Sequence, residues 1–196
     1  MRGAGCGALL VGTLAVLCGG GCKRSPRHAS LAVPDAGTLF MGTGYLSSAY
    51  LADGAYHDYW GLYAGGTYEP ASVEAVEAGR TNVRLLQRYP PDVNHENWPK
   101  IVRMLAERGG FAVRDIDLAI FTQVRLPSIQ IVMDDLGLPM EKTHWVMDKW
   151  GYTGSACIGM CLDDAIDHGM VKPGDLVTLV GSGVGYNYAG VALRMP

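Results

Sequence analysis

The alternation of helical and extended patterns after residue 97 constrains the fold of this chain more than any other feature of its sequence. Four apolar residues recur at helical spacing from Trp98 to Leu105, and Gly109-Gly110 ends that pattern. The later segments predict a strand at 118–121, a helix at 129–136, a strand at 144–147, a helix at 155–168, and strands at 176–180 and 188–195. This order is typical of an α/β fold in which helices pack on a mixed sheet with a terminal antiparallel hairpin.

The part of the chain before residue 98 has weaker patterns. Residues 38–50 predict a strand that ends at the Asp53-Gly54 turn. Residues 55–92 hold many aromatic residues, glycines and prolines, with a short helix expected over 72–78. A long irregular segment in a compact domain usually covers a site or an interface.

The 196 residues are enough for one domain, which we place at 37–196, plus an appended segment at 1–36. Hydrophobic residues make up 48% of the chain, which predicts a globular protein and not a disordered one. The 16 Lys and Arg nearly balance the 19 Asp and Glu, so no overall charge favours nucleic acid or an anionic membrane. Any anionic ligand must therefore be held locally.

Residues 1–36 allow two interpretations. Arg2, the apolar run at 8–18 and the basic pair Lys23-Arg24 have the shape of a secretory or lipoprotein signal, which would make the protein exported or lipid-anchored. The apolar run is too short for a transmembrane helix. Alternatively, residues 3–11 are a glycine-rich strand of the fold, and the protein is cytoplasmic.

Several motifs occur in the order found in a known family. They are TQVRLPSI at 122–129, GYTGSA at 151–156 and LVTLVGSGVGYNYAGVALRM at 176–195, joined by DLGLPMEK at 135–142 and VKPGDLV at 171–177. Together they resemble the carboxyl-terminal half of beta-ketoacyl-ACP synthase III, of the thiolase superfamily. The resemblance covers residues 115–196 closely and 38–114 loosely.

The resemblance implies one half of a thiolase-like fold and an acyltransferase of fatty acid or polyketide type. Its substrates would be acyl thioesters of coenzyme A or acyl carrier protein, with no cofactor beyond the coenzyme A or phosphopantetheine of the substrate. It also implies a homodimer, or a heterodimer with a ketosynthase subunit. The family's nucleophilic cysteine lies in an amino-terminal half, and residues 3–11 resemble the strand before the crossover between halves. We therefore expect the cysteine-bearing half to be missing.

The family's catalytic histidine and asparagine of this half fall on Thr122 and Tyr152, so both are substituted. A threonine cannot carry positive charge near neutral pH, which predicts a catalytically degenerate protein. The resemblance gives substrate-binding roles to the segment after the strand and to the glycine loop, namely Gln123, Val124, Arg125, Gly183 and Gly185. We expect the glycine loop to face one pocket with Gln123 and Tyr152.

Three functional hypotheses stay open: a truncated or degenerate acyltransferase, a non-catalytic partner of a complete ketosynthase, and a lipid-anchored binding domain. No metal site is predicted. His144 is interpreted as a packed core residue, while His28, His57, His95, His168 and the pair Asp163-Asp164 are expected to be exposed. Cys157 and Cys161 are interpreted as packing residues. The helix faces around Cys157 and Ile129 are expected to lack a covering partner within this chain.

Overall fold

The computed structural model describes residues 44–196, so both interpretations of residues 1–36 fall outside the described range. The strands are β1 (Gly44–Tyr56), β2 (Trp60–Gly61), β3 (Arg84–Leu85), β4 (Leu118–Phe121), β5 (Leu176–Gly183) and β6 (Gly185–Arg194). The helices are α2 (Val73–Glu77), α3 (Val93–Gly109), α4 (Leu126–Leu136), α5 (Met147–Trp150) and α6 (Cys157–Asp167), with short 3₁₀ turns at Val113–Asp115, Met140–Lys142 and Gly154–Ala156. Within residues 44–196, every helix is too short or too polar for a membrane span.

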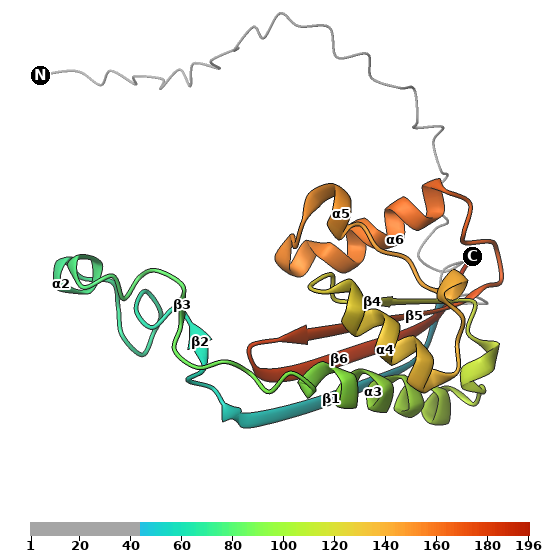
Figure 1. Cartoon of the computed structure of the whole chain (residues 1–196), viewed down its shortest axis with the longest axis horizontal. Coiled ribbons are helices and arrows are strands. Elements are labelled where there is room, and N and C mark those ends of the chain that lie inside the picture. Colours follow the sequence, from blue (N-terminus) through green and yellow to red (C-terminus); the bar gives the residue numbers. More distant parts are fainter. Residues whose placement is uncertain (1–43) are drawn as a thin grey trace, which may run out of the picture. The chain divides into compact units, whose positions relative to one another are not determined.

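The main sheet has the strand order β1-β6-β5-β4 (Figure 1). β4 and β5 are parallel, whereas β6 is antiparallel to both β5 and β1. The hairpin register runs from Leu176 opposite Arg194 to Gly183 opposite Asn187. The predicted mixed sheet and terminal antiparallel hairpin are therefore confirmed.

Helices cover both faces of this sheet, with α3 and α4 on one face and α6 on the other (Figure 1). Each face of the sheet has its own hydrophobic core, the first under α3 and α4 and the second under α6. Side chains alternate along β4, so Ala119 and Phe121 enter the first core while Leu118 and Ile120 enter the second. In the first core, the fully buried Trp98 of α3 stacks on Phe121 with ring centroids 5.3 Å apart. The apolar residues at helical spacing within 98–105 thus form the buried face of α3.

Gly190 of β6 shows how closely α3 lies on the sheet. A Cβ atom at this position would overlap Ile101 Cγ2 and lie 3.0 Å from Leu105 Cδ1. Since real side chains cannot approach so closely, glycine is needed here for the helix to contact the strand backbone.

The expectation of uncovered faces on α4 and α6 is wrong. Ile129, Val132 and Met133 of α4 are fully buried against the sheet of this same chain, and Cys157 and Cys161 of α6 are also buried. The apolar stripes were read correctly, but they face the chain's own strands. The interpretation of both cysteines as packing residues agrees with this burial, and both thiols are free.

Three of the predicted elements that differ from the structure affect the fold near the site. Residues 144–147 form no strand, because Thr143 makes only one parallel bridge, to Ala119, before α5 begins. β1 passes through Asp53-Gly54 and ends at Tyr56. α3 begins five residues before Trp98, with Pro99 inside the helix and not at its start. This earlier start brings residues 93–97 into the fold, next to the site described below.

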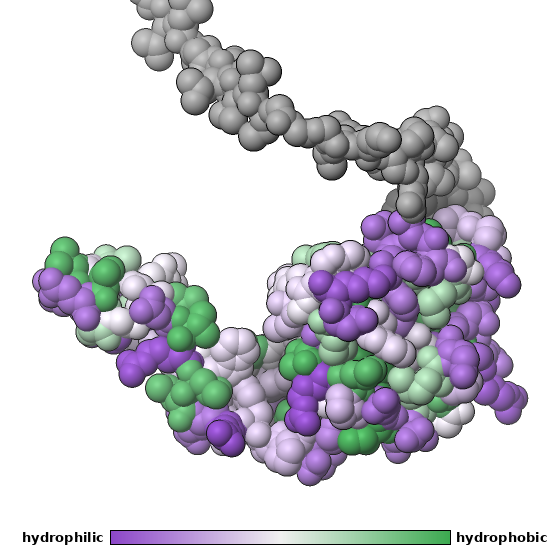
Figure 2. Space-filling model, turned by 45° about the horizontal axis from the view of Figure 1, so that its top comes forward, coloured by the Kyte–Doolittle hydropathy of each residue, from purple (hydrophilic) through white to green (hydrophobic). Residues whose placement is uncertain are grey.

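The segment with β2, α2 and β3 forms a small two-stranded unit. α2 confirms the short helix expected over 72–78, and its N-cap Ser72 accepts a hydrogen bond from the Ala75 N–H at 3.1 Å. Apolar side chains lie on the surface of this segment (Figure 2). The exposed ones are Leu62, Val73, Val76, Val83, Leu85 and Leu86.

Candidate functional site

A cavity of about 390 Å³ lies where the ends of β4 and β5 meet the starts of α3 and α4. Ligand sites are common at this edge of a sheet, since loops that follow parallel strands meet there. Its lining is mostly aromatic and apolar: Trp60, Tyr89, Pro90, Pro91, Val93, Asn94, Val124, Arg125, Ser128, Tyr152, Ser182, Gly183, Val184 and Tyr186.

Four residues singled out from the sequence line this cavity, and they come from three separate segments. Val124 and Arg125 follow β4, Tyr152 follows α5, and Gly183 ends β5. The expected meeting of the glycine loop with Tyr152 is therefore present. The shared lining gives these residues access to one ligand.

Arg125 supplies positive charge to the cavity wall. Its backbone is extended at the N-cap position of α4, and its guanidinium makes no hydrogen bond or ion pair with any residue in 44–196. A guanidinium without an internal partner favours an anionic group of a ligand.

Tyr152 occupies the family's asparagine position and is half exposed. Desolvation raises the pKa of its phenol, with smaller contributions from Cys157 and Tyr186. The phenol therefore stays neutral and can donate a hydrogen bond into the cavity.

Thr122 and Gln123 lie behind the cavity wall and do not line it. The Thr122 Oγ1 accepts a hydrogen bond from the Ser182 N–H at 2.8 Å, which ties β4 to β5. Gln123 is fully buried: its Nε2 donates to the Phe121 carbonyl at 2.9 Å, and its Oε1 accepts from the Val146 N–H at 2.8 Å. Both ends of the Gln123 amide bond to the backbone of this chain, so its substrate contact stays a prediction that this position behind the cavity wall does not favour.

Thr122 likewise has no geometry for a catalytic role. Its side chain is buried, and its hydroxyl oxygen is engaged by β5. Gly185 begins β6 and is not part of the cavity lining, so its substrate contact likewise stays a prediction.

A cluster of tyrosines forms one wall of the cavity. Tyr89 and Tyr186 pack edge to face with centroids 4.7 Å apart, and Tyr59 stacks on Tyr89 at 5.3 Å. The Tyr186 hydroxyl donates to Asn94 Oδ1 at 3.1 Å, which joins this wall to α3. Sequence reasoning did not assign these residues to the site, although the density of aromatics in the irregular segment was the available signal.

His95 was expected to be exposed, and this is wrong. Its side chain is only 17% exposed, since α3 begins early enough to place it against α4. Its Nε2 lies 3.1 Å from Ser128 Oγ, and its Nδ1 lies 3.3 Å from Asp92 Oδ1. No spacing in the sequence links these residues, because Ser128 lies 33 positions after His95.

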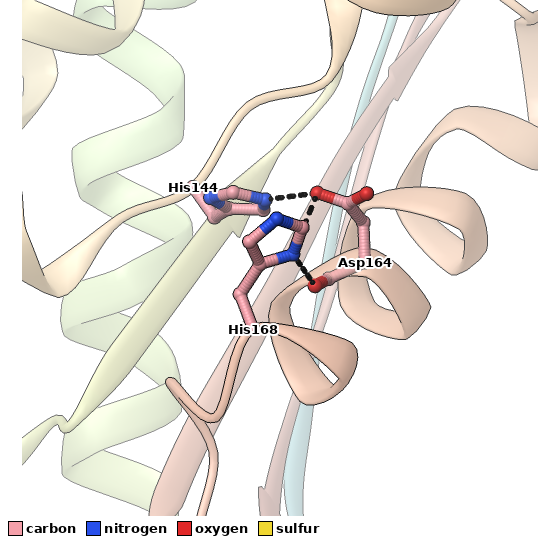
Figure 3. A group of neighbouring side chains, drawn as sticks. All are labelled: His144, Asp164 and His168. Atoms are coloured by element: carbon pink, nitrogen blue, oxygen red, sulfur yellow. Dashed lines mark hydrogen bonds and ion pairs between the residues drawn. The ribbon is translucent and has the colours of Figure 1, made fainter.

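A second polar cluster joins α6 to the segment before α5 (Figure 3). His144 Nε2 lies 2.7 Å from Asp164 Oδ2, and His168 Nδ1 lies 2.7 Å from the Asp164 carbonyl oxygen. Lys149 Nζ donates to both carboxylate oxygens of Asp164 at 2.9 Å. His144 is thus a hydrogen-bonded packed residue, as interpreted from the sequence, but Asp164 is largely buried and not part of a solvated face.

The positions of His144, Asp164 and His168 would also allow them to bind a metal ion. Potential ligand atoms of His144, Asp164 and His168 all lie within 4.8 Å of one another. The Asp164 carboxylate, however, already neutralises the ammonium of Lys149, which would compete with a cation. We interpret the cluster as an ion-pair network, and the absence of a metal site stays a prediction.

This network is expected to make stability depend on acid pH. Hydrogen bonds from Lys149, and next from His144, hold the pKa of Asp164 below its ordinary 3.8. The stabilisation is therefore complete above pH 3.8, and it is lost as the pH falls through the lower pKa of the folded state. Asp164→Asn should lower the free energy of unfolding by about 1–2 kcal/mol at neutral pH, and by less below the folded pKa, as measured by urea unfolding.

Asp163→Asn is the matched control, since Asp163 is the exposed neighbour on the same helix. It should change stability by less than about 0.5 kcal/mol. An equal loss in both variants, or a loss from Asp164→Asn that persists unchanged in acid, would contradict the role of this network.

Comparisons with known proteins support both the fold and the motif alignment. Residues 106–195 match the sequence model of the family described as 3-Oxoacyl-[acyl-carrier-protein (ACP)] synthase III C terminal. A beta-ketoacyl-[acyl-carrier-protein] synthase III of Symbiobacterium thermophilum is 36% identical over 157 residues, which are 78% of this chain and 46% of that protein. One from Syntrophomonas wolfei is 36% identical over 170 residues, which are 85% of this chain and 49% of that protein.

Solved structures give the same result for the fold. The 3-oxoacyl-[acyl-carrier-protein] synthase III of Aquifex aeolicus superposes with a TM-score of 0.62 at 22% identity, over 78% of this chain and 44% of that one. The corresponding protein of Thermus thermophilus gives 0.62 at 24% identity, over 80% and 47%. The fold is therefore thiolase-like, of the α/β class.

Within this class, the chain resembles the carboxyl-terminal half of beta-ketoacyl-[acyl-carrier-protein] synthase III, and residues 106–195 carry the domain of that name. The chain spans about half the length of the curated relatives it matches, 46% and 49% of the two named here.

Proposed function

We propose that this chain binds an acyl thioester in the 390 Å³ cavity, as a ketosynthase III-like protein of fatty acid or polyketide type metabolism. The observation that carries this proposal is the convergence of Arg125, Tyr152 and Gly183 on one largely apolar cavity. An apolar wall suits an acyl chain or a pantetheine arm, and the unpaired guanidinium suits the phosphates of coenzyme A. Coenzyme A or phosphopantetheine would enter as part of the substrate, with no separate cofactor.

The same geometry argues against the condensation for which its relatives are named. Thr122 and Tyr152 stand at the histidine and asparagine positions, and Thr122 does not reach the cavity. When catalytic side chains act together, replacing some of them removes most of the catalytic activity. We therefore propose that this chain, acting alone, is degenerate for carbon–carbon bond formation.

A partner role is supported by a different observation. Six aliphatic side chains are exposed on the segment from Leu62 to Leu86, a feature typical of surfaces that bind other proteins. A second copy of this chain or a complete ketosynthase subunit is the proposed occupant. The proposed substrates would place the protein in the cytoplasm.

Calorimetric titration with a non-hydrolysable acyl-CoA thioether tests the binding proposal. We expect saturable binding to the wild-type chain. Arg125→Ala should bind at least roughly tenfold more weakly than the wild-type chain, because a charge-assisted contact contributes roughly 1.5–3 kcal/mol. Wild-type protein should form no ketoacyl product from acyl-CoA and malonyl-ACP. The same sample should sediment as a dimer or larger species. Failure of the thioether to bind would contradict the proposed function.

A further inference from the structure

Three neighbouring side chains, of which Ser128 lines the cavity, have the connectivity of a hydrolytic triad. Ser128 Oγ lies 3.1 Å from His95 Nε2, and His95 Nδ1 lies 3.3 Å from Asp92 Oδ1. A carboxylate only accepts hydrogen bonds, so the Nδ1 proton points to Asp92 and Nε2 accepts from the Ser128 hydroxyl. This is the protonation pattern in which an imidazole can take a proton from serine.

The surroundings of Ser128 suit an attacking hydroxyl. Its side chain is nearly buried, yet it lines the cavity together with Arg125. It lies in the first turn of the 11-residue helix α4, whose N-terminal end carries partial positive charge. The helix end and the unpaired Arg125 guanidinium would both stabilise negative charge that develops on a bound carbonyl oxygen.

The third member is the weakest part of the arrangement. The Asp92 side chain is 69% exposed, so water screens its charge, and its contact with His95 is long. It can still orient the imidazole, since it holds Nδ1 from within the same helix turn. A smaller effect is therefore expected from changing Asp92 than from changing Ser128 or His95.

We propose that Ser128, His95 and Asp92 hydrolyse the acyl thioester bound in this cavity, an inference that rests on the proposed binding function. Ser128 Oγ bonds to the thioester carbonyl carbon as its proton passes to His95 Nε2. The carbon–sulfur bond breaks, and the leaving thiolate takes that proton. Water then attacks the acyl carbon as one of its protons passes to His95 Nε2. The carbon–oxygen bond to Ser128 breaks, His95 returns that proton to Ser128 Oγ, and a carboxylic acid leaves.

Thiol release from acyl-CoA, followed with a thiol-reactive dye on the full chain, tests this reaction. Ser128→Ala and His95→Asn should each lower kcat/KM roughly 100-fold or more, and Asp92→Asn roughly tenfold. Mass spectrometry after treatment with a fluorophosphonate should place the adduct on Ser128, and His95→Asn should abolish labelling. Ser155→Ala and His57→Asn are the matched controls, because both residues are exposed and outside the cavity lining, and they should retain full rates.

A second variant at position 128 distinguishes loss of the nucleophile from loss of folding. Ser128→Cys keeps the volume of the side chain, so it should unfold at the wild-type temperature while losing the fluorophosphonate adduct. Thiol release that survives Ser128→Ala, or an adduct that survives Ser128→Cys, would overturn the triad. Binding of the acyl-CoA thioether without any thiol release would also overturn the triad but leave the proposed binding function intact, whereas absence of binding would overturn both.

Discussion

Replacing Trp98 with alanine is expected to lower the free energy of unfolding by about 3–5 kcal/mol. Trp98 is fully buried in α3 and stacks on Phe121 at the centre of the first core. Truncation would remove its contacts with the sheet and leave a cavity that the neighbouring strands cannot fill by relaxation. Urea unfolding followed by circular dichroism would measure the loss.

Trp98→Phe is the informative control. The indole Nε1 is buried and has no hydrogen-bond partner within the described residues, so phenylalanine removes an unsatisfied polar group while keeping an aromatic ring on Phe121. We expect a loss under about 1.5 kcal/mol. A loss as large as that of Trp98→Ala would show that the stacking of α3 on β4 is not the source of the stability.

Replacing Gly183 with phenylalanine is expected to weaken acyl-CoA thioether binding roughly 100-fold or more, equivalent to about 2.7 kcal/mol. Gly183 lines the cavity, and a Cβ built there meets no atom within 4 Å. The new side chain should therefore fit without local strain and occupy space that the ligand needs. Calorimetric titration would measure the change in affinity.

Gly159→Phe is the matched control, because Gly159 also has open space at its Cβ but lies on the exposed side of α6, outside the cavity. It should bind the thioether with wild-type affinity. Both variants should unfold near the wild-type temperature. Unchanged affinity in Gly183→Phe would place the ligand elsewhere on the protein.

The alternation of patterns in the sequence was sufficient for the α/β class and for most elements after residue 97. The spacing of apolar residues is encoded locally, so Trp98 to Leu105 form one apolar stripe of a helix regardless of the surface that packs on it. The glycine turn between β5 and β6 is equally local and favours their pairing. The motifs also predicted one pocket shared by the glycine loop, Tyr152 and Gln123, and the structure brings Gly183 and Tyr152 together there, with Arg125 beside them and Gln123 behind the wall. The residues that line the cavity come together because loops that follow parallel strands meet at one edge of the sheet.

What covers each apolar stripe was decided only by the tertiary structure. The faces around Ile129 and Cys161 were correctly read as apolar, but periodicity does not say which surface an apolar face meets. In the same way, the family resemblance implied a substrate contact for Gln123, whereas the tertiary structure bonds Thr122 to Ser182 of β5 and Gln123 to the backbone of Phe121 and Val146.

The contact between His95 and Ser128 is the clearest case of information that the sequence alone did not provide. Sequence reasoning started α3 at Asn97 and left His95 in an irregular segment, because Pro99 is a strong signal for a helix start. In the structure the helix begins at Val93, and His95 contacts Ser128 of α4. The sequence thus determined the fold class, the elements and the residues that gather at the strand ends. Tertiary packing alone decided which polar side chains meet there, since a hydrogen bond between residues 33 positions apart depends on how two helices lie together.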